Sequence, residues 1–258
     1  MAELEYAVED GIARLTINRP ERRNAVSFDV MRGLRDGLAE ARGDESVRVV
    51  VLTGAGEQAF CAGADLTGIA DNAGAIAAHD GRGAFADLFR DLWSLGKPTI
   101  ARVRGFALAG GFGLAMSCDF VIAADDAEFG TPEVNVGLWP YMITIPLLRS
   151  IPPRLVLELM MTGRRVDAVE AARAGLVNRV VPITELDAAV DALARDLAAK
   201  SPLVLRLGKS AFHHVLDLDA DHALDYLQAM LTITTLSDDA AEGVAAFAEK
   251  RAPRWTGQ

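Results

Sequence analysis

Residues 107–113 read ALAGGFG and carry three glycines in seven positions between two apolar segments. Residues 98–103 before them have the composition of a buried strand, and residues 114–116 after them continue an apolar helical pattern. Glycine loses more backbone entropy on folding than any other residue, so repeated glycines indicate that backbone must approach something closely. We therefore expect the backbone amides of this stretch to face a ligand or another loop.

A second stretch of small residues, FCAGADL at 60–66, follows a β-branched run at 47–53 that predicts another buried strand. Both stretches thus lie just past the carboxyl end of a predicted strand, where open α/β sheets place ligands. Two backbone N–H groups that converge on one oxygen form an oxyanion hole. Packing of a turn against a helix explains either stretch alone, whereas two stretches at equivalent strand ends favour a shared site.

The rest of the chain divides into a part rich in strands and a part rich in helices. Alternating apolar residues on both sides of Asp10-Gly11 predict a β-hairpin, and Ser27 is the predicted N-cap of a helix that runs to about Arg42. Further strands are expected at 120–123, 128–131 and 176–181, and a helix at 84–95. Long amphipathic helices are expected at 185–200, 203–216, 219–236 and 238–251. This pattern predicts an α/β core followed by a helical tail.

Composition excludes several functional classes. The 258 residues are 51% hydrophobic and 24% charged, and the net charge is −10. An acidic protein of this kind is not a general nucleic-acid binder, and no run of about 20 apolar residues predicts a membrane span. The N-terminus has no features of a signal peptide, so a cytoplasmic location is expected.

The cysteines and a few cationic residues are the next candidates for ligand contacts. Cys61 and Cys118 lie in apolar surroundings without a CxxC motif, so we expect them to be reduced and buried. The cations considered for an anionic ligand are Arg19, Arg22, Arg23, Lys250 and Arg251.

Motifs for other chemistries fail at defined positions. Gly111 and Gly113 begin a dinucleotide fingerprint, but Met116 stands in place of its third glycine. The LGKS segment at 207–210 lacks the first glycine of a phosphate loop, and Ser117 lacks the flanking glycines of a nucleophile elbow. The four histidines form no metal-ligand pattern. These failures argue against hydride transfer, nucleotide hydrolysis, serine hydrolysis and metal catalysis.

Taken together, five blocks resemble the crotonase superfamily, the enoyl-CoA hydratase/isomerase family, over essentially the whole chain. The blocks are residues 18–20 with 24–25, 60–66, 105–111 with 118–119, 129–133 with 136–137, and 171–177 with 180–181. The resemblance implies an α/β fold with a spiral of ββα units in residues 1–198. It also implies that the helices of residues 199–258 build a homotrimer, often paired into a hexamer.

The resemblance further implies an acyl-CoA thioester as substrate. The oxyanion hole of the family corresponds to the backbone N–H groups of Ala64 and Gly110, which would stabilise an enolate. No metal or redox cofactor is expected, because coenzyme A is part of the substrate. By position, the residues that would contact it are Arg22, Arg23, Ala25, Ala62, Asp65 and Leu66.

Two other contacts with coenzyme A follow from the same resemblance. Thr67 stands where many hydratases carry a lysine for a phosphate contact. Phe247 and Lys250, expected three apart on one helix face, fit the adenine end of a coenzyme A bound to a neighbouring subunit.

The reaction is predicted from one glutamate that is present and one that is absent. Hydratases of the family use two glutamates, and the first corresponds to Gly113, which has no side chain. The second corresponds to Glu133, whose apolar surroundings predict a raised pKa suited to proton transfer. One carboxylate is sufficient to move a proton between two carbons, so we expect an enoyl-CoA isomerase in which Glu133 is catalytic.

Alternatives remain open from the sequence. A 2-enoyl-CoA hydratase would need a second acid, for which Asp65, Asp119 and Glu128 are candidates. A member that binds acyl-CoA without catalysis is a third hypothesis. Trp139 and Tyr141 replace a glycine-rich stretch of many hydratases and indicate an altered acyl pocket, or serve as ordinary wall residues.

Overall fold

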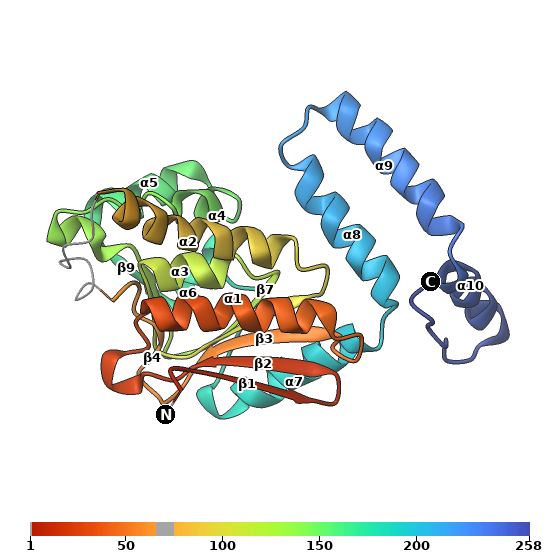
Figure 1. The fold of residues 1–258 in the computed structure, drawn as a ribbon, viewed down its shortest axis with the longest axis horizontal. Helices are drawn as coiled ribbons and strands as arrows, with labels where there is room; N and C mark the ends of the chain where they lie inside the picture. Colours follow the sequence, from red (N-terminus) through yellow and green to blue (C-terminus); the bar gives the residue numbers. More distant parts are fainter. Residues whose placement is uncertain (1, 66–74) are drawn as a thin grey trace.

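The computed structural model describes residues 2–65 and 75–258 and contains two sheets (Figure 1). The larger sheet has the strand order β1-β2-β3-β5-β7-β10, in which β1 and β2 are antiparallel and the other neighbours are parallel. Its hairpin turns at Asp10 and Gly11, both with positive φ, as the predicted turn requires. These strands are β1 (Leu4–Glu9), β2 (Ile12–Ile17), β3 (Val49–Gly54), β5 (Thr99–Val103), β7 (Phe120–Ala124) and β10 (Arg179–Val181).

The smaller sheet supplies the second strand of each repeat. It consists of β4 (Ala59–Cys61), β6 (Phe106–Leu108), β8 (Glu128–Gly130) and β9 (Arg165–Asp167), in that order. The strands β4, β6 and β8 directly follow β3, β5 and β7 along the chain, and each pair is followed by a helical segment. The predicted α/β spiral of ββα units is therefore confirmed.

Helices cover both faces of the larger sheet. α1 (Phe28–Gly43) and α2 (Ala75–Trp93) lie side by side over one face, and α7 (Leu186–Ala198) lies on the other (Figure 1). Along β3 the alternation of side chains sends Val50 and Leu52 to the core under α1 and α2, and Val49 and Val51 to the core over α7. Because β3 is buried on both faces, its sequence is a continuous apolar run.

Shorter helical segments connect the strands after the first repeat. They are η1 (Pro20–Arg22), α3 (Gly110–Met116), η3 (Pro132–Val136), α4 (Thr144–Leu148), α5 (Pro153–Thr162), α6 (Ala168–Ala174) and η4 (Ile183–Glu185). Of these, α3 and η3 follow β6 and β8 directly, so both begin at the same edge of the smaller sheet.

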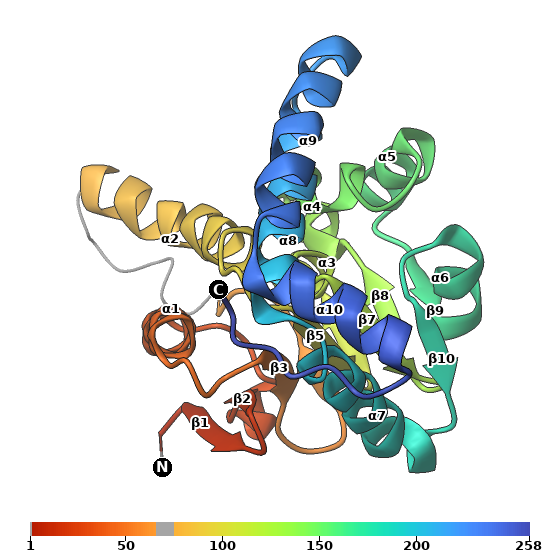
Figure 2. The same cartoon turned by 90° about the vertical axis from the view of Figure 1, so that its right-hand side faces the viewer.

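The C-terminal helices extend from this core. α8 (Pro202–Val215) and α9 (Ala220–Thr235) project as a hairpin, and α10 (Asp238–Glu249) lies at its base (Figures 1 and 2). α9 has no buried residue, and its apolar residues Leu224 and Leu231 are exposed, as is Leu236 just after its end. An apolar helix face without cover in the single chain indicates an interaction surface.

Most element predictions agree with the structure, with differences at their ends. Ser27 caps α1 by accepting a hydrogen bond from Val30 N at 3.1 Å. α2 begins at Ala75, earlier than the predicted residue 84, and the strand expected at 176–181 covers only β10. The sequence did not predict β4, β6 or β9, because a strand of three residues has too little alternation to be recognised. Cys61 and Cys118 are buried and free, as predicted.

Among the described residues, no helix has the length and apolarity required to cross a membrane. Within the same ranges, no three histidine, cysteine or acidic side chains are grouped so that they could hold a metal ion.

Candidate active site

The two small-residue loops lie against each other, as predicted. Cys61 of β4 pairs with Ala107 of β6, so the residues that follow these strands are neighbours. A Cβ atom on Gly63 would lie 3.3 Å from Gly110 N, and one on Gly111 would lie 2.2 Å from Cys61 O. Gly63 also has a φ of +104°, a conformation that favours glycine. Contact between the two loops therefore explains why these positions are glycines.

Two backbone amides at this junction are free of intramolecular partners. Within the described ranges, neither Ala64 N nor Gly110 N donates a hydrogen bond. The bridge between Val26 and Ala64 is made by Val26 N and Asp65 N, which leaves the Ala64 amide out. Gly110 is the first residue of α3, and the first amides of a helix have no acceptor within it. Both amides are thus available to an external acceptor.

The same two amides are close in space. Ala64 N lies 3.7 Å from the point that a Cβ atom on Gly110 would occupy. Ala109, which precedes Gly110, has φ +51° and ψ −128°, a conformation that costs a non-glycine residue about 1–3 kcal/mol. The surrounding fold maintains this conformation, which sets the direction of the Gly110 amide.

Glu133 follows β8, and β8 pairs with β6, the strand that leads to Gly110. Leu108 pairs with Gly130, and Ala109 N donates to Gly130 O at 2.9 Å. Glu133 follows in η3, which begins at Pro132. Its Oε2 atom is buried and has no hydrogen-bond partner among residues 2–65 and 75–258. Burial raises the pKa of Glu133, and a hydrogen bond from its own backbone only partly opposes this. The predicted raised pKa is in agreement with this environment.

The acids considered as a second catalytic group are all paired with cations. The pairs and their N–O distances are Asp65 with Arg19 (2.9 Å), Asp119 with Lys209 (2.7 Å) and Glu128 with Arg165 (3.1 Å). Burial raises the pKa of Asp119, but hydrogen bonds and charges from His213 and Lys209 outweigh it, so its pKa is lowered. Gly113 is buried within α3 and has no side chain to contribute. Glu133 therefore differs from these acids in having a buried oxygen without a partner.

The residues expected to contact coenzyme A gather around the first loop. Arg22 and Arg23 are exposed, and the Arg23 guanidinium lies 5.7 Å from the Phe106 ring centre. Ala62 N donates to Arg23 O at 3.0 Å, which ties this segment to the loop after β4. Ala25 O accepts a hydrogen bond from Arg19. Leu66 and Thr67, also expected here, lie outside the described residues.

Arg19 and Arg251 are not free cations, contrary to the idea that they hold an anion. Arg19 is mostly buried and pairs with Asp65 and, at 3.1 Å, with Glu3. Arg251 pairs with Glu242 and Glu249. Such pairings depend on the tertiary fold, so charge clustering along the chain does not reveal them.

The remaining predicted contact residues lie in two different places. Trp139 is half-buried against the core, whereas Tyr141 is 77% exposed. Phe247 is 87% exposed on α10, which Figure 1 shows at the opposite end of the molecule from β4. Lys250 lies just past the end of α10 with a left-handed φ of +56°, so the expectation that it shares a helix face with Phe247 is wrong. One chain alone does not bring α10 to the junction of the loops.

Asn24, which belongs to the first block of the family resemblance, holds the backbone of two segments together. It is fully buried, with a φ of +56°. Its Nδ2 donates to Ala55 O at 2.9 Å and to Ala59 O at 2.7 Å, while its Oδ1 accepts from Arg19 N. A buried amide with three backbone partners fixes the loop before α1 against the start of β4.

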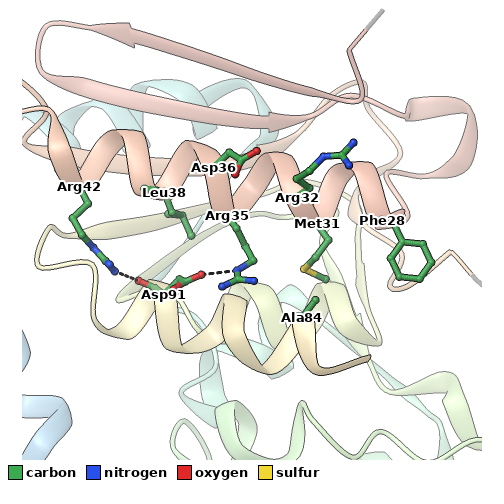
Figure 3. Close-up of a pocket in the computed structure, with 10 residues that line it drawn as sticks. Phe28, Met31, Arg32, Arg35, Asp36, Leu38, Arg42, Ala84 and Asp91 are labelled. Atoms are coloured by element: carbon green, nitrogen blue, oxygen red, sulfur yellow. Dashed lines mark hydrogen bonds and ion pairs between the residues drawn. The ribbon is translucent and has the colours of Figure 1, made fainter. Parts of the chain in front are cut away.

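A groove and a cavity lie away from the junction of the two loops. Figure 3 shows a groove of about 460 Å³ between α1 and α2, where Arg35 Nε donates to Asp91 Oδ2 at 2.8 Å and Arg42 donates to Asp91 O at 3.3 Å. A cavity of about 610 Å³ lies between the core and α8, next to Asp119 and Lys209. The described residues that line these hollows do not include Ala64, Gly110 or Glu133.

Known proteins resemble this chain over nearly its whole length. A family model described as enoyl-CoA hydratase/isomerase matches residues 7–258. A carnitinyl-CoA dehydratase from Proteus mirabilis is 36% identical over 266 residues, which cover 99% of this chain and 98% of the relative. A crotonyl-CoA hydratase from Syntrophomonas wolfei is 37% identical over 244 residues, 94% of each chain. The crystal structure of an enoyl-CoA hydratase from Mycobacterium smegmatis superposes with a TM-score of 0.94 at 34% identity and covers 98% of each chain.

Proposed function

Because the chain belongs to the enoyl-CoA hydratase/isomerase family, we propose that it binds an acyl-CoA thioester with the carbonyl oxygen between Ala64 N and Gly110 N. Two amides without intramolecular partners, at the ends of neighbouring strands, support this placement. Negative charge develops on the carbonyl oxygen when a neighbouring carbon loses a proton. The removal of one donor of an oxyanion hole typically costs about 3 kcal/mol of transition-state stabilisation.

Glu133 acts as the proton carrier in this proposal. Its carboxylate removes a proton from C2 of a 3-enoyl-CoA, and the C–H electron pair delocalises into a dienolate whose oxygen the amides stabilise. The carboxylic acid then returns the proton to C4, the carbonyl reforms, and the double bond lies between C2 and C3. Atoms and charges balance without water, a metal or a redox cofactor. The reaction is a Δ3-to-Δ2 enoyl-CoA isomerisation.

The observation that supports a single carboxylate is the contrast between Glu133 and its neighbours. In the part of the chain that the structure describes, Glu133 Oε2 is buried and has no partner, while Asp65, Asp119 and Glu128 are paired with cations. Adding water across a double bond requires one group for the water and one for the α-proton, whereas isomerisation requires only one.

A direct assay tests this function. The protein is mixed separately with a 3-enoyl-CoA and with crotonyl-CoA, and the wild type is compared with Glu133→Gln. We expect isomerisation of the 3-enoyl-CoA that the substitution abolishes, and weak hydration of crotonyl-CoA. Robust hydration of crotonyl-CoA that is undiminished in Glu133→Gln would refute the account.

A hydro-lyase is the second candidate, because relatives of this chain are named carnitinyl-CoA dehydratase and crotonyl-CoA hydratase. In that case Glu133 handles the α-proton and another group handles the hydroxyl. Hydration faster than isomerisation, lost in Glu133→Gln, would favour this candidate over the first.

We also propose that residues 199–258 associate chains into a homotrimer or a dimer of trimers that works in the cytoplasm. The exposed apolar residues of α9 and the distance of α10 from the loop junction support this assignment. Phe247 and Lys250 of one chain would then meet coenzyme A bound to another. Light scattering on the full chain should give three or six times the monomer mass of 27.5 kDa. A monomer would refute the assembly without affecting the assignment of Glu133.

A further inference from the structure

Position 113 lies one turn beyond the Gly110 amide, on the same face of α3. A Cβ atom there would lie 2.3 Å from Ile143 Cγ2 and 2.7 Å from Ile143 Cβ. On its other side, Phe89 Cζ would be 3.2 Å away. Distances this short to Ile143 are not tolerated in a packed interior, so the side-chain volume of position 113 is already occupied.

Ile143 is firmly held in this place. It is 4% exposed and precedes α4, with its carbonyl accepting from Leu147 N at 3.2 Å. The turn that leads to it is closed by Thr144 Oγ1, which donates to Pro140 O at 3.1 Å, and by Thr144 N, which donates to Tyr141 O at 3.3 Å. This turn makes Ile143 point inward, while Tyr141 remains exposed.

Phe89 is held by a row of aromatic rings along α2. Its centroid lies 6.1 Å from that of Phe85 and 6.4 Å from that of Trp93, and it is 3% exposed. Phe85 lies against Gly110 as Phe89 lies against Gly113, because a Cβ atom on Gly110 would be 2.9 Å from Phe85 Cζ. Phe85 and Phe89 of α2 therefore pack against two glycines one turn apart on α3, Gly110 and Gly113.

We propose that Ile143, backed by Phe89, determines which reaction the site performs; we call this pair the apolar plug. The plug fills the space beside Gly113 with hydrocarbon, so neither a second acid nor an ordered water can stand there. This inference rests on the proposed function. With water excluded, a dienolate beside Glu133 returns its proton to carbon.

The occupied volume is tested by a pair of substitutions whose effect should change sign. Alanine is the better helix former, but Gly113→Ala should lower Tm by about 3 °C or more because its methyl group meets Ile143. In an Ile143→Ala background the same substitution should raise Tm, because the methyl group then fills a cavity. Gly208→Ala is the matched control: it lies in α8 with nothing within 4 Å of its Cβ position, and it should leave Tm unchanged or raised. An unchanged or raised Tm in Gly113→Ala alone would overturn the plug.

The exclusion of water is tested by the ratio of crotonyl-CoA hydration to 3-enoyl-CoA isomerisation. Ile143→Ala should raise this ratio about 10-fold, and Gly113→Glu with Ile143→Ala should raise it at least about 10-fold further. A ratio unchanged in both variants would overturn the role of Ile143. A wild type that isomerises no 3-enoyl-CoA would instead overturn the proposed function, and the Tm measurements would still decide whether the plug exists.

Discussion

Asp119 and Glu133 are two partly buried carboxylates whose surroundings differ. Asp119 follows the C-terminal end of α3, where its Oδ2 accepts from Thr99 N at 2.7 Å, Thr99 Oγ1 at 2.9 Å and Lys209 Nζ at 2.7 Å. Glu133 lies in η3, after β8, where its Oε2 is buried and has no hydrogen-bond partner among the described residues. The pKa of Asp119 is lowered and that of Glu133 is raised.

This difference separates a structural acid from a reactive one. Burial disfavours the charged form of both carboxylates. Hydrogen bonds and cations around each carboxylate determine whether this free-energy cost is offset. Lys209, Thr99 and His213 hold Asp119 as an anion that joins α8 to the core. Glu133 has only a hydrogen bond from its own backbone to oppose the effect of burial, so its pKa is raised. The comparison teaches that a buried acid without partners is the better candidate for catalysis.

The largest expected effect comes from Glu133→Gln. Removal of the proton carrier should lower kcat on a 3-enoyl-CoA by about 10³-fold, because general acid–base groups contribute 10²–10⁴-fold. Tm should be unchanged or higher, since a neutral amide avoids the burial of charge. Steady-state kinetics and thermal melts measure both. Activity within about 10-fold of wild type would remove the distinction between the two acids.

Asp119→Ala should reverse this pattern. It leaves Lys209, whose side chain is 9% exposed, without its carboxylate, and such losses typically cost about 3–5 kcal/mol. The free energy of unfolding measured in urea should fall accordingly, while kcat of the folded enzyme changes only a few-fold. Asp119→Asn, which keeps an acceptor for Thr99, is the control and should lose less. A stable Asp119→Ala variant with low kcat would contradict the structural role.

The contributions of Glu133 and Asp119 to stability should change with pH in opposite directions. The carboxylate form of Glu133 removes the proton, so kcat/KM should fall about tenfold per pH unit below its raised pKa. Because this pKa is higher in the folded state, stability is present below the unfolded value of 4.5 and is lost as pH rises through the raised pKa. Glu133→Gln should abolish that loss; urea titrations at several pH values would show it.

Asp119 should show the opposite linkage. Its folded pKa is lower than the unfolded value of 3.8, so its contribution to stability is present above 3.8 and is lost as pH falls through the folded pKa. Asp119→Asn should flatten the acid side of the stability profile and leave the neutral side unchanged. An acid side identical to that of the wild type would show that Asp119 carries no linked stability.

The smallest expected effect is the release of strain at Ala109. Glycine adopts φ +51° and ψ −128° readily, so Ala109→Gly should stabilise the protein by about 1 kcal/mol and raise Tm by about 2–4 °C. Ala115→Gly, in the interior of the same helix, is the control and should destabilise by a similar amount. A lower Tm in Ala109→Gly would mean that the backbone of Ala109 at the start of α3 carries no strain.

Local patterns in the sequence predicted much of this arrangement. Strand composition, the Asp10-Gly11 turn and the Ser27 cap depend on neighbouring residues, and all three agree with the structure. The two small-residue stretches predicted adjacent loops, although these loops follow β4 and β6 of the smaller sheet and not β3 and β5 directly.

Local sequence patterns do not predict contacts between residues that are far apart in the chain. Lys209 belongs to a segment considered and rejected as a phosphate loop, and nothing near it in the chain identifies Asp119 as its partner. The sequence shows that Gly113 lacks a carboxylate, but only the fold shows that Ile143 occupies the space beside it. Pairing and volume depend on three-dimensional proximity, whereas periodicity reports only which face of an element is apolar.

The most direct test of the account is a crystal structure of the Glu133→Gln variant with a 3-enoyl-CoA bound. We predict that the thioester oxygen lies within about 3 Å of both Ala64 N and Gly110 N, with C2 and C4 of the acyl chain facing the substituted side chain at position 133. An oxygen that contacts only one of these amides, or an acyl chain that faces away from position 133, would contradict the account.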